Sequence, residues 1–405
     1  MLSWGKTISY RGGVLSLSRR ELLKSKAGLL AFSTSLTQVA SGMSIFSGKF
    51  QLGPLLEPDD NGIKLPEGYK SRVIATTGTK VSLTGNRNSD YTWHRAPDGG
   101  ACFAMADGGW VYACNSEIQP RGGVGAIRFN SQGQAVDAYS ILENTRRNCA
   151  GGPSPWGTWF SCEEVSRGKV FECFVESKNK TAKRWDGLGW FKHEAIAFDP
   201  NTYNAYLTED ERDSCFYRYV PKNPQAPNLY AQGQGKLEVA QMGDDGHVTW
   251  LTIDNPNPSK LQKPTRHQVS DAERFNGGEG IWYHEGSVYF TTKGDNRVWV
   301  YNIDNNTIGL LYDKATSKAP ILSGVDNVTV APDGSVIVAE DGGDMQLVVL
   351  DEFSQPRPLL QVLGQSRSEI TGPAFSPDHK RLYFNSQRGR NGNGITYEVT
   401  GPFVS

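Results

Sequence analysis

The sequence lacks the short motifs that mark several common classes of enzyme. Its 405 residues contain no Walker loop, no G-x-G-x-x-G dinucleotide fingerprint and no H-E-x-x-H zinc motif. Ser116 has no nucleophile elbow around it, and the six cysteines lack the C-x-x-C spacing of zinc sites. With a net charge of −1, the chain has no basic excess that would favour nucleic acid as a partner.

The N-terminal region has the features of an export signal. Ser18–Lys24 contains an arginine pair followed by Leu-Leu-Lys, and the mildly apolar stretch Ala27–Ala40 comes next. This order is typical of a twin-arginine signal peptide, predicted here at residues 1–41, and the apolar stretch is too short for a stable membrane span. An amphipathic helix of the fold is the alternative. The signal predicts a periplasmic or secreted protein that meets the twin-arginine export machinery, which carries folded proteins, often with a cofactor installed.

The rest of the chain repeats one pattern of short strands and turns. In Val325–Asp341 a strand leads into a Pro-Asp-Gly turn, and a second strand ends on acidic residues. The same order recurs in residues 101–117, 193–210, 279–295 and 372–387. The first strands of successive copies, at Glu279, Asp326 and Gly372, are 47 and 46 residues apart, a period that suits four-stranded propeller blades.

Trp156–Glu164 supplies a further hairpin, so we predict an all-β, six-bladed β-propeller in one domain, residues 42–405. The strand Tyr69–Thr76 is expected to complete the last blade with C-terminal strands. The longer gap between Glu194 and Glu279 predicts extended outer strands or a long loop in one blade. A β-sandwich or two barrels are the alternatives.

Acidic residues occur at the same places in repeat after repeat. Because the innermost strand of each propeller blade lines the central channel, these residues are expected to converge at its mouth. Converging carboxylates repel one another unless cations bind between them, and oxygen ligands suit calcium, magnesium or manganese. Alternatively, each carboxylate caps a turn or pairs with a nearby basic residue. The candidate metal ligands are Cys149, Glu163, Glu164, Glu194, Glu209, Asp210, Glu279, Asp326, Asn327, Glu340 and Asp341.

The segment Asn148–Glu164 combines a soft ligand with hard ones. Cys149 is placed in a Gly/Pro-rich turn, and the aromatic strand that follows ends at Glu163 and Glu164. A thiolate beside carboxylates suits a softer metal such as iron or zinc. A hairpin with a buried cysteine and two solvated glutamates is the alternative. The even number of cysteines is compatible with disulfides in an exported protein, although a cysteine that binds metal leaves at least one other unpaired.

Three sets of motifs resemble the PhoX-type alkaline phosphatases. These are Asn148–Glu164, then Phe191–Ala195 with Tyr206–Asp210 and Phe216–Pro221, then Glu369–Asp378. The resemblance, which extends from about Asp98 to the C-terminus, implies a six-bladed propeller with iron and calcium at the channel mouth that hydrolyses phosphate monoesters of small molecules. It implies that Cys149 ligates iron. It also implies metal-binding roles for Glu163 or Glu164, Glu194 and Glu279, with Asp326, Glu340 and Asp341 as further ligands.

Two features depart from that family. The chain is shorter than the well-known phosphatases, and Asn276-Gly277-Gly278 stands where they carry an arginine just before the residue that matches Glu279. Such an arginine helps to hold phosphate. Lys293, Arg146 or Arg147 is a candidate to replace it.

We therefore predict a monomeric, metal-dependent phosphatase in which Glu194, Glu279 and Lys293 carry catalysis. One alternative is a metal-stabilised propeller that binds a ligand or a protein without phosphatase activity. Another is a calcium-dependent lactonase or esterase on a similar propeller.

Overall fold

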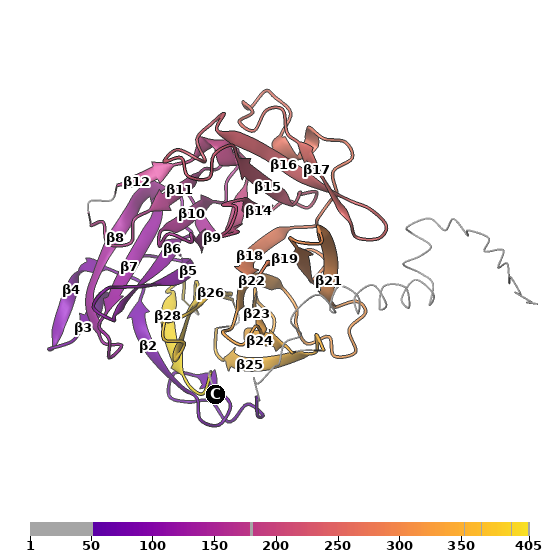
Figure 1. The fold of residues 1–405 in the computed structure, drawn as a ribbon. Coiled ribbons are helices and arrows are strands. Elements are labelled where there is room, and N and C mark those ends of the chain that lie inside the picture. The colour runs from indigo at the N-terminus through magenta and orange to yellow at the C-terminus, as the bar shows by residue number, and fades with distance from the viewer. Residues whose placement is uncertain (1–51, 179–180, 352, 366, 390, 404–405) are drawn as a thin grey trace, which may run out of the picture. The chain divides into compact units, whose positions relative to one another are not determined.

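The computed structural model describes residues 52–178, 181–351, 353–365, 367–389 and 391–403. These residues form six antiparallel sheets around a central channel, together with a separate hairpin (Figure 1). The predicted all-β, six-bladed propeller is confirmed. The predicted signal peptide lies outside the described residues.

The first three blades along the chain have four, four and five strands. The first consists of β5 (Pro97–Ala104), β6 (Trp110–Ser116), β7 (Gly122–Phe129) and β8 (Ala135–Thr145). The second consists of β9 (Asn148–Pro153), β10 (Trp159–Glu163), β11 (Val170–Cys173) and β12 (Ala182–Arg184). The third consists of β13 (His193–Phe198), β14 (Ala205–Glu209), β15 (Tyr217–Pro221), β16 (Gly235–Met242) and β17 (Val248–Thr252). The fifth strand of this third blade and the loop after it fill the long gap seen in the sequence.

The last three blades include strands from both ends of the described chain. The fourth consists of β18 (Gly278–His284), β19 (Ser287–Thr292), β20 (Arg297–Asn302) and β21 (Thr307–Asp313). The fifth consists of β22 (Val325–Val330), β23 (Val336–Glu340), β24 (Gln346–Leu350), β25 (Pro356–Val362) and β1 (Ile63–Lys64). The sixth consists of β26 (Ile370–Phe375), β27 (Arg381–Ser386), β28 (Ile395–Thr400) and β2 (Lys70–Thr76). The separate hairpin and two 3-10 helices are β3 (Lys80–Leu83), β4 (Arg87–Thr92), η1 (Asp186–Leu188) and η2 (Thr265–His267).

N-terminal strands complete the last two blades. β2 pairs antiparallel with β28, as predicted for Tyr69–Thr76, and β1 pairs with β25. Each innermost strand contacts the innermost strands of the two blades beside it, so β5, β9, β13, β18, β22 and β26 surround the channel (Figure 1). Aromatic rings fill the space between blades, as where Phe216 stacks on Phe290 with centroids 4.5 Å apart.

The glycines around Cys149 permit close packing of strands, and this corrects one expectation. Asn148–Pro153 is the innermost strand β9 and is not a turn. A Cβ at Gly152 would overlap the carbonyl oxygen of Ile196 in the next blade, and a Cβ at Gly99 would lie 2.6 Å from the Cα of Ala150. The Gly-rich composition therefore reflects the narrow spacing of the innermost strands rather than a change of chain direction.

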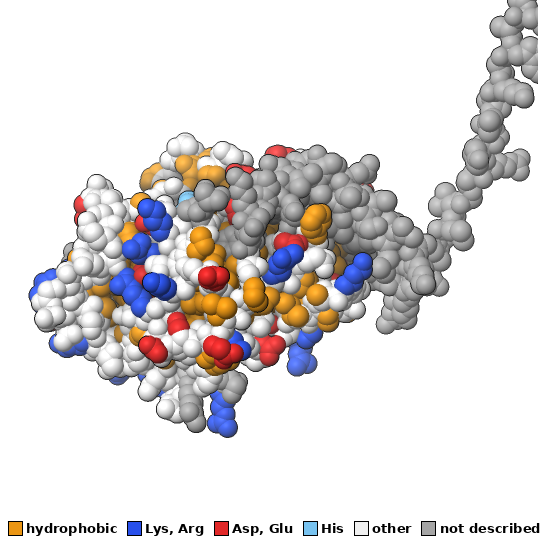
Figure 2. All heavy atoms as spheres, turned by 90° about the horizontal axis from the view of Figure 1, so that it is seen from below, with side chains coloured by type: hydrophobic (Ala, Val, Ile, Leu, Met, Phe, Trp, Pro, Cys, Tyr) orange, Lys and Arg blue, Asp and Glu red, His pale blue; other side chains and the backbone are white. Residues whose placement is uncertain are grey.

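The surface shown in Figure 2 carries interspersed basic, acidic and hydrophobic side chains. This mixture agrees with the net charge of −1. Within the described part of the chain, neither of the two short helices has the length and hydropathy to cross a bilayer.

Candidate metal centre

A β-bulge occurs at the same place in all six blades. Between the two innermost strands of each blade, the register advances three residues on the first strand and two on the second. In the fourth blade, for example, Gly278 pairs with Thr292 and Ile281 with Phe290, so that Glu279 and Gly280 are left between them. Such bulges redirect side chains next to functional sites. The first bulged residues, here called the bulge ring, are Asp98, Cys149, Glu194, Glu279, Asp326 and Gly372.

Hydrogen bonds between neighbouring blades hold several of these bulges. A polar side chain one residue before the end of a second strand donates to the backbone carbonyl of the bulge ring in the next blade. Asn115 Nδ2 donates to Cys149 O at 2.7 Å, and Asn385 Nδ2 donates to Asp98 O at 2.9 Å. Thr291 Oγ1 donates to Asp326 O at 2.5 Å. The backbone that carries the candidate ligands is therefore positioned by a neighbouring blade as well as by its own.

A second set of side chains follows immediately after the second strand of each blade. We call this set the strand-end ring, and its members are Glu117, Glu164, Asp210, Lys293, Asp341 and Gln387. The register explains the alignment in the first five blades, because there the preceding residue pairs with the residue before the bulge ring. In the sixth blade the pairing is shifted by one residue, and Ser386 pairs with Ile370. Four of the six members are acidic.

Among the described residues, eight members of the two rings together with Glu369 form four groups, and within each group the potential ligand atoms lie within 4.8 Å of one another. The groups are Cys149–Glu164–Glu194, Glu194–Glu279–Asp326, Asp326–Asp341–Glu369 and Asp98–Glu117–Glu369. Glu194 belongs to two of them, is 1% exposed and has a buried Oε1 without a hydrogen-bond partner. A buried carboxylate oxygen left unpaired is costly, and a cation at this position would satisfy it.

Burial and mutual repulsion perturb the acidity of the cluster. Burial and the charges of Glu279 and Glu164 raise the pKa of Glu194 well above its ordinary value. Burial raises the pKa of Glu164 to about 7 and that of Glu369 to about 8. Burial, with Asp98 and Glu194 nearby, also raises the pKa of the Cys149 thiol well above its usual range. In the metal-free protein these groups retain protons that a bound metal would displace.

Basic side chains contact the cluster at its more exposed edge. Arg147 Nη2 contacts Glu117 Oε1 at 2.5 Å and Glu164 Oε2 at 2.8 Å, and Arg388 binds Glu117 and Glu369. Lys192 Nζ lies 2.9 Å from Glu164 Oε1 and 2.5 Å from Asp210 Oδ2. Although burial raises the pKa of Glu117, Arg388 and Arg147 outweigh it, and the net shift is downward.

Seven of the predicted ligands lie in the two rings, and four do not. Glu163 accepts from the amides of Arg146 and Lys169, at 3.0 and 3.1 Å. Glu209 accepts from Tyr217 Oη at 2.6 Å and from Arg266 at 3.0 Å. Glu340 accepts from the amides of Ser323 and Gln346, at 2.9 and 3.0 Å. These three carboxylates therefore face away from the cluster and bind within or beside their own blades.

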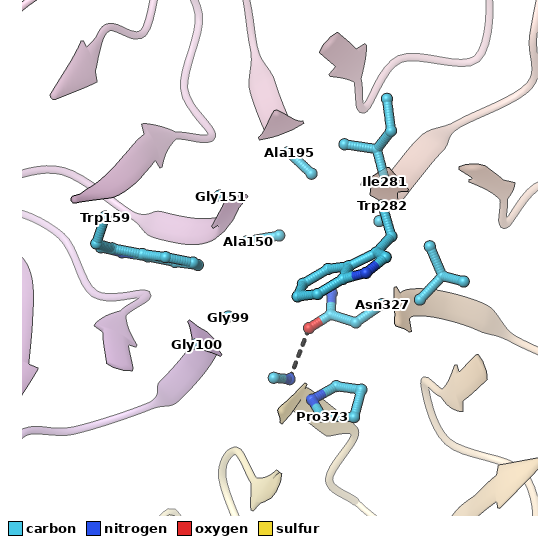
Figure 3. A pocket seen from close by; sticks show the side chains of 13 residues that line it. Gly99, Gly100, Ala150, Gly151, Trp159, Ala195, Ile281, Trp282, Asn327 and Pro373 are labelled. Atoms are coloured by element: carbon cyan, nitrogen blue, oxygen red, sulfur yellow. Dashed lines mark hydrogen bonds between the residues drawn. The ribbon is translucent and has the colours of Figure 1, made fainter. Parts of the chain in front are cut away.

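Asn327 occupies the second bulged position of β22, beyond the bulge ring. Its Nδ2 donates to Asp326 Oδ1 at 2.7 Å, and its Oδ1 accepts from the Gly372 amide at 2.7 Å (Figure 3). Both polar atoms of the amide are thus occupied by the chain itself. Its role in the described structure is to join β22 to β26.

Three acidic members of the groups were not assigned as ligands from the sequence. Asp98 and Glu117 occupy the bulge ring and the strand-end ring of the first blade, and Glu369 precedes β26. The sequence repeat could have identified the first two as ligands, because Asp98 corresponds to Glu279 and Glu117 corresponds to Glu164. Glu369 occupies neither ring and reaches the cluster through its bridge to Asp341, which the sequence repeat does not reveal.

Behind the bulge ring, small residues let the innermost strands approach one another closely, so the channel is narrow there. Gly99, Ala150, Ala195 and Gly280 line this section, and the Trp282 indole lies across it (Figure 3). Trp282 also lines a larger cavity of about 460 Å³ at the far ends of the innermost strands. The indole therefore separates the candidate metal centre from that cavity.

Comparisons with known proteins agree with the geometry. A family model described as alkaline phosphatase PhoX matches residues 119–179 and 165–389. The structure of Pseudomonas fluorescens PhoX in complex with vanadate, a transition-state analogue, is 16% identical, with a TM-score of 0.68 over 87% of this chain and 98% of that chain. A gluconolactonase from Xanthomonas campestris is 12% identical, with a TM-score of 0.48 over 87% and 99% of the two chains. No curated protein matches the sequence.

Proposed function

Because the chain belongs to the PhoX family of alkaline phosphatases, and is thus a phosphomonoesterase, we propose that it hydrolyses small phosphate monoesters at the mouth of its propeller. The observation that carries this placement is the pair of groups that share Glu194, a residue with a buried oxygen that has no hydrogen-bond partner. The vanadate held by the Pseudomonas fluorescens relative supports phosphoryl chemistry in this fold.

The residues fit the metals that the family requires. We assign the Cys149–Glu164–Glu194 group to iron, because it joins one soft sulfur donor to two carboxylates. The three all-oxygen groups suit calcium. Bound metal would supply Lewis-acid polarisation of the phosphoryl group.

Arg147 and Arg388 are the residues proposed to bind the substrate phosphate. Their side chains are 40% and 46% exposed. Both form ion pairs with Glu117, so the two guanidinium groups lie beside one carboxylate at the mouth. A guanidinium offers paired N–H donors that fit a phosphoryl group, and positive charge there stabilises the charge that develops during transfer. These residues replace the arginine that is missing before Glu279.

Metal analysis combined with an activity assay tests the proposal. The purified protein is expected to contain iron and calcium and to cleave an aryl phosphate at alkaline pH. Cys149→Ser is expected to lower the iron content sharply. Cys102→Ser is the matched control, since Cys102 is also a free, partly buried cysteine on an innermost strand but lies outside all four groups.

The outcomes separate the alternatives. Fewer than about one metal per chain would contradict a metal centre, and unchanged iron in Cys149→Ser would contradict the assigned ligand. Full metal content without turnover of monoesters would favour a binding propeller. Parallel assays of phosphodiesters and lactones identify a different hydrolase.

We also propose that residues 1–41 direct the protein through the twin-arginine pathway to the periplasm or the medium. The arginine pair at Arg19 and Arg20 supports this proposal. Replacing both with lysine should leave the protein in the cytoplasm of a host that has the pathway. Continued export of that variant would contradict the proposal.

A further inference from the structure

Lys293 is the one basic member of the strand-end ring. It follows β19 directly, as Glu117, Glu164, Asp210, Asp341 and Gln387 follow the second strands of the other blades. The pairing of Thr292 with Gly278 places it in the same register as the acidic members. In the fourth blade the repeat therefore delivers an ammonium group to a place where four other blades deliver a carboxylate.

The ammonium group lies among three carboxylates. Lys293 Nζ is 3.0 Å from Glu279 Oε1, 3.1 Å from Asp326 Oδ2 and 3.2 Å from Asp341 Oδ2. The contact with Asp326 is a hydrogen bond, and the contacts with Glu279 and Asp341 are ion pairs. The Lys293 side chain is 33% exposed, whereas Glu279 and Asp326 are 2% and 5% exposed. The positive charge is therefore directed into the buried part of the cluster.

These contacts overlap with two of the candidate metal groups. Glu279 and Asp326 belong to the group that contains Glu194, and Asp326 and Asp341 belong to the group with Glu369. A cation bound to either group would share at least one oxygen neighbour with the ammonium. Two positive charges at such close range repel each other unless they are separated by more ligands.

We propose that Lys293 is a resident cation that takes the place of one divalent ion in the centre. The wild-type chain then binds fewer divalent ions than its carboxylates can hold, and removing the ammonium opens a calcium site formed by Glu279, Asp326 and Asp341. The inference rests on the proposed function. It also explains why phosphate binding is assigned to Arg147 and Arg388, because the charge of Lys293 is already paired with three carboxylates.

The calcium content of Lys293→Met, compared with that of the wild type, tests the inference. After equilibration with calcium and removal of free ions, the variant is expected to hold about one more calcium per chain than the wild type. Its melting temperature should also rise more on addition of calcium, because binding to the native state stabilises it. Lys293→Arg is the control, since it keeps the positive charge and should gain no calcium.

Equal calcium contents in Lys293→Met and the wild type would overturn the inference, whatever activity either protein has. Lys293→Gln, of similar length but uncharged, provides the same comparison if the methionine variant does not fold. A wild-type protein without metal would contradict the proposed function instead. The difference between variant and wild type still decides whether Lys293 occupies a cation site.

Discussion

At the scale of single residues, adjacent acids in this chain have different tasks. Glu163 accepts backbone amides beside its own blade, whereas Glu164 belongs to the group with Cys149 and Glu194. Successive side chains at a strand end leave in opposite directions, so only one of each acidic pair reaches the mouth. The same division separates Glu209 from Asp210 and Glu340 from Asp341.

Arg147 and Arg388 permit a direct test of phosphate binding. Hydrogen bonds to charged groups contribute about 1.5–3 kcal/mol, and about 1.4 kcal/mol corresponds to a tenfold change in affinity. Arg147→Met and Arg388→Met are therefore each expected to weaken competitive inhibition by inorganic phosphate by about 10- to 100-fold. Inhibition constants at fixed pH measure the effect.

Arg146→Met is the matched control for that measurement. Arg146 is adjacent in sequence and 45% exposed, but it pairs with Glu163 outside the cluster. Its replacement should leave phosphate inhibition unchanged. A similar loss in all three variants would show a general effect of surface charge and would refute the assigned clamp.

At the scale of elements, the innermost strands position the site by packing closely. The bulges repeat in all six blades, and Gly280 lies so near β22 that a Cβ there would be 2.6 Å from the Asn327 Cα. A side chain at Gly280 would therefore not fit unless the backbone of β22 moved. The composition of β9 follows from this spacing rather than from a need for a turn.

Gly152→Ala tests this close packing. The added methyl would overlap the Ile196 carbonyl oxygen, which belongs to the backbone of β13 and cannot rotate away. We expect the free energy of unfolding to fall by about 3 kcal/mol, the upper part of the range for overpacked cores. Denaturant unfolding of the protein measures it.

Gly309→Ala provides the comparison for Gly152→Ala. Gly309 lies in the outermost strand β21, where a Cβ would be 3.7 Å from a Val300 methyl. Its replacement should change stability by less than about 1 kcal/mol. Equal losses of unfolding free energy in the two variants would contradict the proposed role of Gly152 in the close packing between blades.

At the scale of the whole molecule, the mouth concentrates negative charge in a chain that is nearly neutral overall. The four groups contain eight carboxyl residues, and among the described residues four basic side chains contact the cluster, Arg147, Lys192, Lys293 and Arg388. The excess of acids is the reason that a metal-free fold retains protons at the mouth. Metal binding and stability are therefore linked.

The metal-free protein should lose stability as the pH rises. Glu164 and Glu369 have ordinary values of 4.5, and in the fold their pKa values are raised to about 7 and about 8. Groups with raised acid pKa values bind more protons in the folded state, so their stabilising contribution is complete below the ordinary value of 4.5 and is lost progressively as the pH rises to the raised values. With a chelator, the melting temperature should fall as the pH rises from about 4.5 to about 8, and it should level off above that.

Added calcium should cancel that fall, because it binds the deprotonated carboxylates. Thermal melts with chelator and with calcium across this pH range provide the comparison. Equal pH profiles under both conditions would show that the mouth does not bind calcium.

The sequence by itself determined the strand repeat, the number of blades and the acidic positions, because short alternating strands and turns are local patterns. It also contained the motif around Cys149 that resembles the phosphatase family. It did not determine which acid of each pair faces the mouth, or that Cys149 lies in a strand.

Only the tertiary structure decided the composition of the centre. Asp98 and Glu369 come from the first and sixth blades, which meet because β26 packs against β5. The position of Lys293 among three carboxylates likewise depends on the closure of the whole ring. Such contacts arise from the register of strands far apart in the chain, and the repeat fixes that register only when the blades pack together.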